Sequence, residues 1–124
     1  MRELLPRLTY QEKFIMILKI QTIVTILLFM IIFSSCMVNK RDEWYFKGLD
    51  FGVEGKYNEA IMCYDKAIEI DPEFVYAWYN KGLALYYTGK YKEAIKCYDK
   101  AIKLDPNYSP AKAGKEEALK ITDK

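Results

Sequence analysis

The three cysteines, Cys36, Cys63 and Cys97, are the side chains in this sequence best suited to chemistry, and they are not arranged for catalysis. The chain contains no histidine, which is the side chain most used for proton transfer near neutral pH and the commonest metal ligand. It also has no CxxC pair and no carboxylates clustered at ligand spacing. We therefore predict that the protein is not an enzyme and that it uses no metal ion or cofactor.

The charged residues are balanced over most of the chain. Four of the 19 basic and two of the 17 acidic residues precede Cys36, which leaves fifteen of each beyond it. Proteins that bind the phosphate backbone of nucleic acids need a broad basic field. The composition therefore argues against nucleic acid as a partner.

An apolar segment near the N-terminus predicts contact with a membrane. Residues 20–33 (IQTIVTILLFMIIF) follow Lys13 and Lys19 and run directly into Ser34, Ser35 and Cys36. A basic flank before an apolar core of this length is typical of a signal peptide. We predict that residues 1–35 form a signal peptide or a transmembrane anchor.

The same segment resembles the lipobox of prokaryotic lipoproteins, in which the signal is cut before a cysteine that then carries lipid. The resemblance implies lipid attachment at Cys36, although Phe33 stands where that family usually has leucine or another aliphatic residue. The alternative is an uncleaved helix over residues 14–33, whose 20 residues at ~1.5 Å each would just cross a hydrocarbon core of about 30 Å. A start at Met16 instead of Met1 would give a compact signal.

The basic residues before the apolar segment favour a cytoplasmic N-terminus. The remainder of the chain is then expected at the membrane, on the extracytoplasmic face of a prokaryotic cell.

A repeat of 34 residues dominates the rest of the chain. Residues 41–74 align with residues 75–108 without a gap, and 19 of the 34 positions are identical. The matching blocks are WYFKGL and WYNKGL, then GKYNEAIMCYDKAIEIDP and GKYKEAIKCYDKAIKLDP. Apolar residues recur in them at helical spacing among Lys, Glu and Asp. This pattern resembles the tetratricopeptide repeat, a helix-turn-helix unit of 34 residues.

The resemblance extends to the single residues that let the helices of this family pack closely. Small residues at a helix crossing let two backbones approach while a facing aromatic ring fills the gap. The matching positions are Trp44, Gly48, Ala60, Tyr64, Ala67 and Pro72 in the first repeat, and Trp78, Gly82, Ala94, Tyr98, Ala101 and Pro106 in the second. The resemblance implies an all-α fold with two repeats, at residues 41–74 and 75–108.

Turn residues set the expected helix ends. We predict helices at residues 42–54, 57–70, 76–88 and 91–104, with residues 36–40 as a short linker before them. Gly55 and Gly89 fall where the first helix of each repeat stops, a place suited to left-handed backbone. A proline after Asp71 and after Asp105 ends each second helix.

Residues 109–124 are predicted to form a capping helix. Ser109 is expected as its N-cap and Pro110 in its first turn. Lys112 and Glu116 stand where a third repeat would have tryptophan and glycine, so a solvated end to the stack is expected instead. Two repeats are fewer than the usual three, and the domain is therefore expected to be marginally stable alone or to associate.

Cys63 and Cys97 occupy equivalent positions in the two repeats. Neighbouring packed helices lie ~8 to 10 Å apart, and these two cysteines sit two helices apart in the predicted stack. A disulfide needs Cα atoms within about 7 Å. Both cysteines are therefore predicted to be buried and unpaired.

In tetratricopeptide-repeat proteins the ligand lies along a concave surface built mainly by the first helix of each repeat. The resemblance places there Tyr45, Leu49, Gly52, Tyr76, Tyr79, Asn80, Leu83 and Tyr86. Tyrosine offers a broad apolar face and a hydroxyl with little rotamer entropy to lose, which suits peptide recognition. Tyr45 and Tyr79 also fit a role in packing alone.

Some relatives hold a C-terminal carboxylate with a clamp of lysines and asparagines. Here only Asn80 stands at a clamp position, and Tyr45 and Leu49 occupy the places of lysine and asparagine. Without charge-assisted donors a carboxylate is poorly held. The resemblance therefore implies a neutral or apolar protein segment as ligand.

The predicted function is that of a membrane-tethered protein-interaction module. The alternative is a structural subunit that assembles into a homo-oligomer or a larger envelope complex. Repeat one carries four basic and nine acidic residues and repeat two six basic and three acidic, which favours head-to-tail association of copies. The same charges also fit ordinary solvated helix surfaces.

Overall fold

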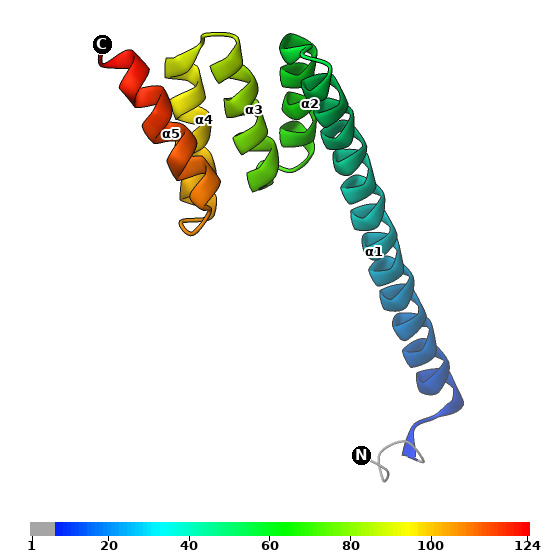
Figure 1. The fold of residues 1–124 in the computed structure, drawn as a ribbon. Coiled ribbons are helices and arrows are strands. Elements are labelled where there is room, and N and C mark those ends of the chain that lie inside the picture. The colour runs from blue at the N-terminus through cyan, green and yellow to red at the C-terminus, as the bar shows by residue number, and fades with distance from the viewer. Residues whose placement is uncertain (1–6) are drawn as a thin grey trace. The chain divides into compact units, whose positions relative to one another are not determined.

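The structure is a computed structural model that describes residues 7–124, and the elements in that range are helices joined by short turns (Figure 1). They are α1 (Tyr10–Val53), α2 (Tyr57–Ile70), α3 (Val75–Tyr87), α4 (Tyr91–Leu104) and α5 (Ser109–Thr122). The predicted all-α fold with two helical hairpins and a capping helix is confirmed. The residues divide after Cys36 into two units, which are described separately below.

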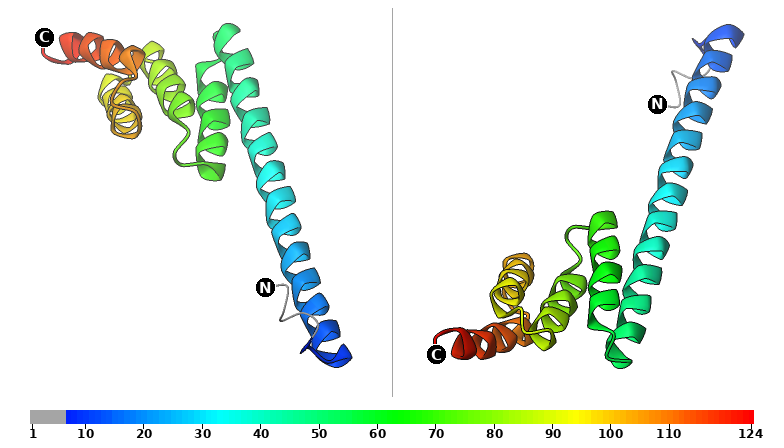
Figure 2. Two further views of the ribbon diagram at one scale, coloured as in Figure 1. Left: turned by 90° about the horizontal axis from the view of Figure 1, so that it is seen from below. Right: turned by 90° about the horizontal axis from the view of Figure 1, so that it is seen from above.

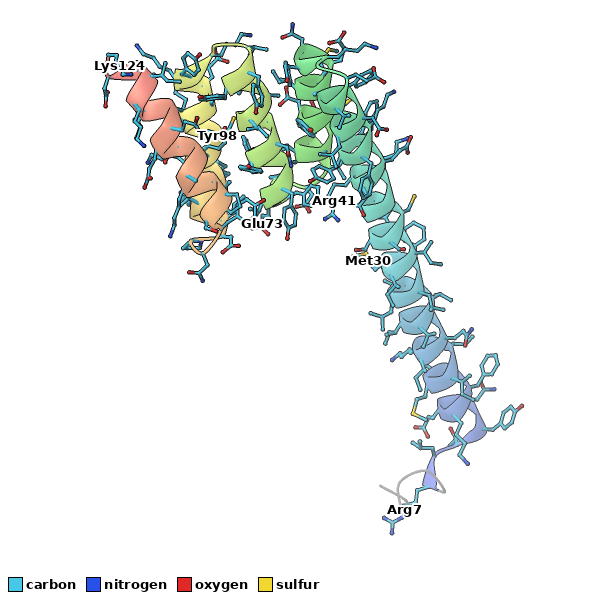
Figure 3. The ribbon with its side chains drawn as sticks, in the orientation of Figure 1. Arg7, Met30, Arg41, Glu73, Tyr98 and Lys124 are labelled. Carbon is cyan, nitrogen blue, oxygen red and sulfur yellow. The ribbon has the colours of Figure 1, made fainter. Side chains whose placement is uncertain are left out.

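The first unit is the N-terminal part of α1. A capping box starts the helix: the backbone N–H of Thr9 donates to the Glu12 carboxylate at 2.8 Å, and the Glu12 N–H donates to Thr9 Oγ1 at 3.3 Å. The apolar side chains of residues 14–33 are exposed along the helix, as Met30 illustrates in Figure 3. By length and composition α1 could cross a membrane.

Residues 36–40, predicted as a short linker, are helical and belong to α1. The stretch contains neither glycine nor proline, so nothing in it stops a helix. For the same reason the first helix, predicted to begin near residue 42, has its N-terminus at Tyr10. The other predicted ends of α1 to α4 agree with the structure to within one residue.

The turns of the second unit use the residues that the sequence indicated. Gly55 and Gly89 adopt positive φ angles of 75° and 79°, which cost glycine little because it has no Cβ. Asp71 and Asp105 are extended at the ends of α2 and α4, as expected before proline. The N-cap prediction for Ser109 is wrong: α5 begins at Ser109 itself, and its N-cap is Tyr108, which makes no side-chain capping bond.

The second unit, Met37–Lys124, is a stack in which α2, α3, α4 and α5 pack on one another in chain order (Figures 1 and 2). Its core consists of alanines, two cysteines, two tyrosines and Leu85, with partly buried aliphatic and aromatic side chains packed around them. The predicted small positions Ala60, Ala67, Ala94 and Ala101 are all fully buried. Helices therefore approach one another closely.

Two glycines meet two tyrosine rings at the tightest crossings. A Cβ built on Gly48 would lie 2.6 Å from Tyr64 Cε1, and one on Gly82 would lie 2.7 Å from Tyr98 Cε1. Real Cβ atoms do not come so close to another heavy atom. Only glycine therefore fits these positions without displacing a buried ring.

The capping helix uses the same contact at a position that the sequence did not indicate. A Cβ on Gly114 of α5 would lie 2.9 Å from Tyr98 Cζ. The ring of Tyr98, labelled in Figure 3, is thus approached by a glycine of α3 and a glycine of α5. Glu116 is the residue 34 positions after Gly82, so the repeat period predicts the close contact there. In the capping helix the contact lies two residues earlier, at Gly114.

Replacing Gly82 with alanine should destabilise the domain, because the new methyl group would meet the Tyr98 ring and lie 3.3 Å from the Ala94 carbonyl oxygen. We expect a loss of about 1–3 kcal/mol in the free energy of unfolding, measured by urea unfolding followed by circular dichroism. Gly52→Ala is the matched control. A Cβ there meets only the Tyr64 hydroxyl, at 3.6 Å, so the better helix propensity of alanine should stabilise the domain by about 0.5–1 kcal/mol. Equal effects from the two variants would contradict the close packing.

Candidate functional site

A cavity of about 310 Å³ lies among α1, α2 and α3 within the second unit. Leucine, valine and alanine side chains and three tyrosines form most of its wall. We call this cavity the groove; its lining residues are Leu49, Gly52, Val53, Tyr57, Tyr64, Asn80, Leu83, Ala84 and Tyr87.

The groove carries no formal charge. Its lining contains no Lys, Arg, Asp or Glu, and burial raises the pKa of the Tyr64 hydroxyl well above its usual value. Tyr64 therefore stays protonated and neutral at physiological pH. The rings of Tyr57 and Tyr87 stack with centroids 5.1 Å apart and an interplanar angle of 16°. The wall thus offers flat aromatic faces and hydroxyl groups.

Asn80 is the one amide side chain on the groove wall, and its two donors are engaged. Asn80 Nδ2 donates to the Tyr45 hydroxyl at 3.0 Å and to the Tyr76 carbonyl oxygen at 2.9 Å. The first bond joins the two repeats, because Tyr45 lies in α1 and Asn80 in α3. An NH₂ group has only two hydrogens to donate. Asn80 must therefore break one of these bonds before it can donate to a ligand carboxylate.

The structure divides the predicted groove residues into two sets. Leu49, Gly52, Asn80 and Leu83 come together on the groove wall. The tyrosines that were predicted beside them are not on this wall: they are Tyr45, Tyr76, Tyr79 and Tyr86. For both sets a role in ligand binding stays a prediction.

These four tyrosines pack against other aromatic rings. Tyr45 lies edge-on to Phe74, with centroids 4.9 Å apart. Tyr76 and Tyr79 both lie edge-on to Tyr108, at 5.7 and 5.4 Å. Tyr86 donates its hydroxyl hydrogen to the Glu117 carboxylate, 3.2 Å away. These contacts provide the packing role that the sequence left open for Tyr45 and Tyr79.

Five lining residues were not predicted: Val53, Tyr57, Tyr64, Ala84 and Tyr87. Tyr87 follows Leu83 by four residues and Asn80 by seven, so helical periodicity could have placed it on the same face. Tyr57 and Tyr64 come from the second helix of repeat one, which the family resemblance assigns to packing. No signal in a single sequence shows that the side of this helix near Tyr57 is open.

Trp78, Cys63 and Cys97 have structural roles in the second unit. The indole N–H of Trp78 donates to the Pro72 carbonyl oxygen at 2.9 Å and so ties α3 to the turn before it. Cys63 and Cys97 are buried as predicted, and both thiols are free. Burial raises the pKa of Cys97 to about 11, so its thiol is protonated and weakly nucleophilic at neutral pH.

Two further predictions concern single sites. Cys36, predicted to carry lipid, is exposed on α1, and its modification stays a prediction. Within residues 7–124 no three His, Cys, Asp or Glu side chains are grouped so that they could hold a metal ion.

Family models match the repeats found by self-comparison. A tetratricopeptide repeat model matches residues 75–108, and a TPR repeat model matches residues 53–89. No match is found among curated protein sequences.

Solved structures show the same fold. The second TPR of Spaghetti (RPAP3), bound to the HSP90 peptide SRMEEVD, is 32% identical with a TM-score of 0.68, over 72% of this chain and 84% of that chain. The TPR2B domain of yeast Sti1 in a complex with pHsp70 is 28% identical with a TM-score of 0.66, over 67% of this chain and 66% of that one. The yeast Sti1 TPR2AB complex with pHSP90 is 27% identical with a TM-score of 0.67, over 68% of this chain but only 33% of that one.

The chain belongs to the tetratricopeptide-repeat family. This family and its fold are those of protein-interaction modules, not of enzymes.

Replacing Tyr45 with phenylalanine should weaken the contact between the repeats, because it removes the acceptor of the Asn80 hydrogen bond. We expect a loss of about 0.5–1.5 kcal/mol in the free energy of unfolding, measured by urea denaturation. Tyr76→Phe is the control, since the Tyr76 hydroxyl makes no hydrogen bond within the described residues and the side chain is exposed. Its stability should stay within about 0.5 kcal/mol of the parent. A larger loss from Tyr76→Phe than from Tyr45→Phe would rule out the proposed importance of this bond.

Proposed function

We propose that the chain is a membrane-tethered protein-interaction module whose groove binds an uncharged or apolar segment of a partner protein. The observation that carries the proposal is the groove itself, a cavity of about 310 Å³ lined by tyrosine and aliphatic side chains without a charged group. Tyrosine rings offer large, rigid contact surfaces at small entropic cost. Apolar contact in such a groove favours ligands that lose little hydration on binding.

The similar structures support a peptide as the kind of ligand. One of them holds the HSP90 peptide SRMEEVD, and two are complexes with pHSP90 and pHsp70. The groove of this chain suits a different peptide. SRMEEVD contains three acidic residues, whereas the groove has no cation in its lining and the amide donors of Asn80 are already bonded. An acidic or carboxylate-ended segment would therefore lose hydration without gaining charge-assisted bonds.

The apolar part of α1 supports the membrane tether. Its aliphatic and aromatic side chains are exposed rather than packed against protein. Contact of such a surface with water is unfavourable, whereas contact with lipid hydrocarbon is not. Two polar side chains within it are bonded to their own helix: Thr22 Oγ1 donates to the Lys19 carbonyl and Thr25 Oγ1 to the Thr22 carbonyl, both at 2.8 Å. Hydroxyls bonded in this way suit a hydrocarbon environment.

Groove binding can be tested by selecting peptides from a displayed library against the full-length chain in detergent. We expect uncharged, apolar peptides to be enriched and SRMEEVD not to bind. Leu83→Glu, which puts a charge on the groove wall, should weaken the selected peptides about tenfold or more. Ile121→Glu makes the same kind of change at an exposed site on α5 and should leave binding unchanged. Enrichment of acidic peptides, or equal binding to the Leu83→Glu variant, would contradict the proposal.

The tether can be tested by membrane fractionation of the wild type and of Cys36→Ser, with mass spectrometry of the N-terminus. We expect the wild-type chain in the membrane fraction. A lipid-modified N-terminal Cys36 that is lost in the variant would identify a lipoprotein, whereas an intact apolar segment in both would identify a spanning helix. Recovery of both proteins in the soluble fraction would exclude a tether.

A further inference from the structure

One contact occurs twice, where α3 packs on α2 and where α5 packs on α4. Lys81 Nζ of α3 lies 2.5 Å from Asp65 Oδ1 of α2, and Lys115 Nζ of α5 lies 2.6 Å from Asp99 Oδ1 of α4. The two lysines are 34 residues apart, as are the two aspartates. The same ion pair therefore occurs at the interface of α2 with α3 and at that of α4 with α5.

Isoleucines accompany the aspartate in each of these interfaces. Ile61 of α2, and Ile95 and Ile102 of α4, pack against the buried cluster that contains Leu85, Ala111 and Ala118. On α4 these positions are spaced by four and three residues around Asp99, which puts Ile95, Asp99 and Ile102 on one face of the helix. α4 thus presents an acidic side chain between two aliphatic ones to α5, and α2 carries Ile61 and Ile68 at the matching positions around Asp65.

Repeat one has the lysine of this contact but no aspartate paired with it among the described residues. Lys47 of α1 precedes Lys81 by 34 residues, and it forms no ion pair within the described residues. It lies instead over the Trp44 ring, 5.2 Å from the ring centroid. Phe51 stands at the position of Leu85, yet Phe51 is only half-buried whereas Leu85 is 3% exposed.

A cavity of about 250 Å³ opens on α1 and α2, at the end of the stack formed by repeat one. It is lined by Trp44, Lys47, Phe51, Glu59, Met62, Cys63 and Lys66. Met62 is an apolar side chain that is 68% exposed, whereas repeat two has the charged Lys96 at the equivalent position. We call Trp44, Lys47, Phe51 and Met62 the end face. The charged lining residues are Lys47, Lys66, which is paired with Glu69 at 3.0 Å, and Glu59. The unpaired Lys47 beside apolar side chains matches what the interior interfaces offer to a helix that is acidic and aliphatic.

We propose that the end face docks an amphipathic helix of a partner protein, one that presents an acidic side chain between aliphatic ones as α2 and α4 do. The docked helix would lie on α1 as α2 lies on α3, with its acidic group on Lys47. This surface is separate from the groove and independent of the function proposed for it.

A folded second copy of this chain does not supply such a helix. Both faces of the required kind in the described residues are already covered, because Asp65 is paired with Lys81 and Asp99 with Lys115. The continuity of the interface and the charge of Lys47 therefore point to a helix from a different protein, such as the second helix of another repeat domain.

The test uses a synthetic peptide of residues 91–104 as the probe. Cys97→Lys and Ala101→Glu in the peptide, joined as a side-chain lactam, hold it helical on the side away from Ile95, Asp99 and Ile102, and circular dichroism checks its helicity. A fluorophore on the peptide reports binding to the full-length chain in detergent by anisotropy. We expect saturable binding below about 1 mM. Absence of binding by the helical peptide in this range would overturn the proposal.

Charge reversal then identifies the surface. Lys47→Glu in the protein should weaken the peptide about two- to fivefold, and Asp99→Lys in the peptide should do the same with wild-type protein. Combining the two changes should restore affinity. Lys112→Glu, the same change at an exposed lysine on α5, should have no effect. Equal effects of Lys47→Glu and Lys112→Glu, or no recovery in the combination, would overturn the proposed register.

Met62→Asp tests the apolar part, at a side chain exposed enough that the change should not impair folding. We expect about tenfold weaker peptide binding. Loss of binding with Leu83→Glu but not with Met62→Asp would place the peptide in the groove and overturn the proposal. Self-association of the wild type in sedimentation, abolished by Met62→Asp, would show that a second copy occupies the end face and would also overturn it.

Discussion

The approach of a glycine backbone to a buried tyrosine ring sets the distance between the two helices of each repeat in the second unit. Gly48 meets Tyr64 and Gly82 meets Tyr98, each within a distance that leaves no space for a methyl group. Because the ring fills the volume that the missing side chain leaves, the crossing is both close and well packed. These contacts set the spacing of α2 against α1 and of α4 against α3, and the Tyr64 ring of the first contact also lines the groove.

The ring of Tyr98 also shows what this arrangement costs. Its hydroxyl is buried and has no hydrogen-bond partner within the described residues, and burial raises its pKa well above the usual value. An unsatisfied buried hydroxyl costs about 1–3 kcal/mol. Tyr64, its equivalent, is also buried but lines the groove. One repeated residue thus serves packing in repeat two, and both packing and the groove wall in repeat one.

Much of the second unit could be predicted from the sequence because its rules are local and repeated. The prolines after Asp71 and Asp105 and the glycines at 55 and 89 define the helix ends through backbone geometry alone. The groove was harder to predict. Tyr45 and Tyr87 are both tyrosines of first helices, and what separates them is which neighbour each ring meets: Tyr45 packs on Phe74, whereas Tyr87 stacks on Tyr57 at the groove wall. Gly114 was missed because the close approach in the cap does not keep the 34-residue period.

The recurring lysine–aspartate pair has a consequence for how such a chain can grow. A repeat carries a lysine that pairs with the repeat before it and an aspartate that pairs with the helix after it. In repeat two these residues are Lys81 and Asp99. A tandem duplication of residues 75–108 would therefore bring both halves of a new interface with it, and neither neighbour would need a compensating substitution. Stacks of this kind gain stability one interface at a time. Lengthening by whole units is thus an evolutionary step that the existing contacts already accommodate.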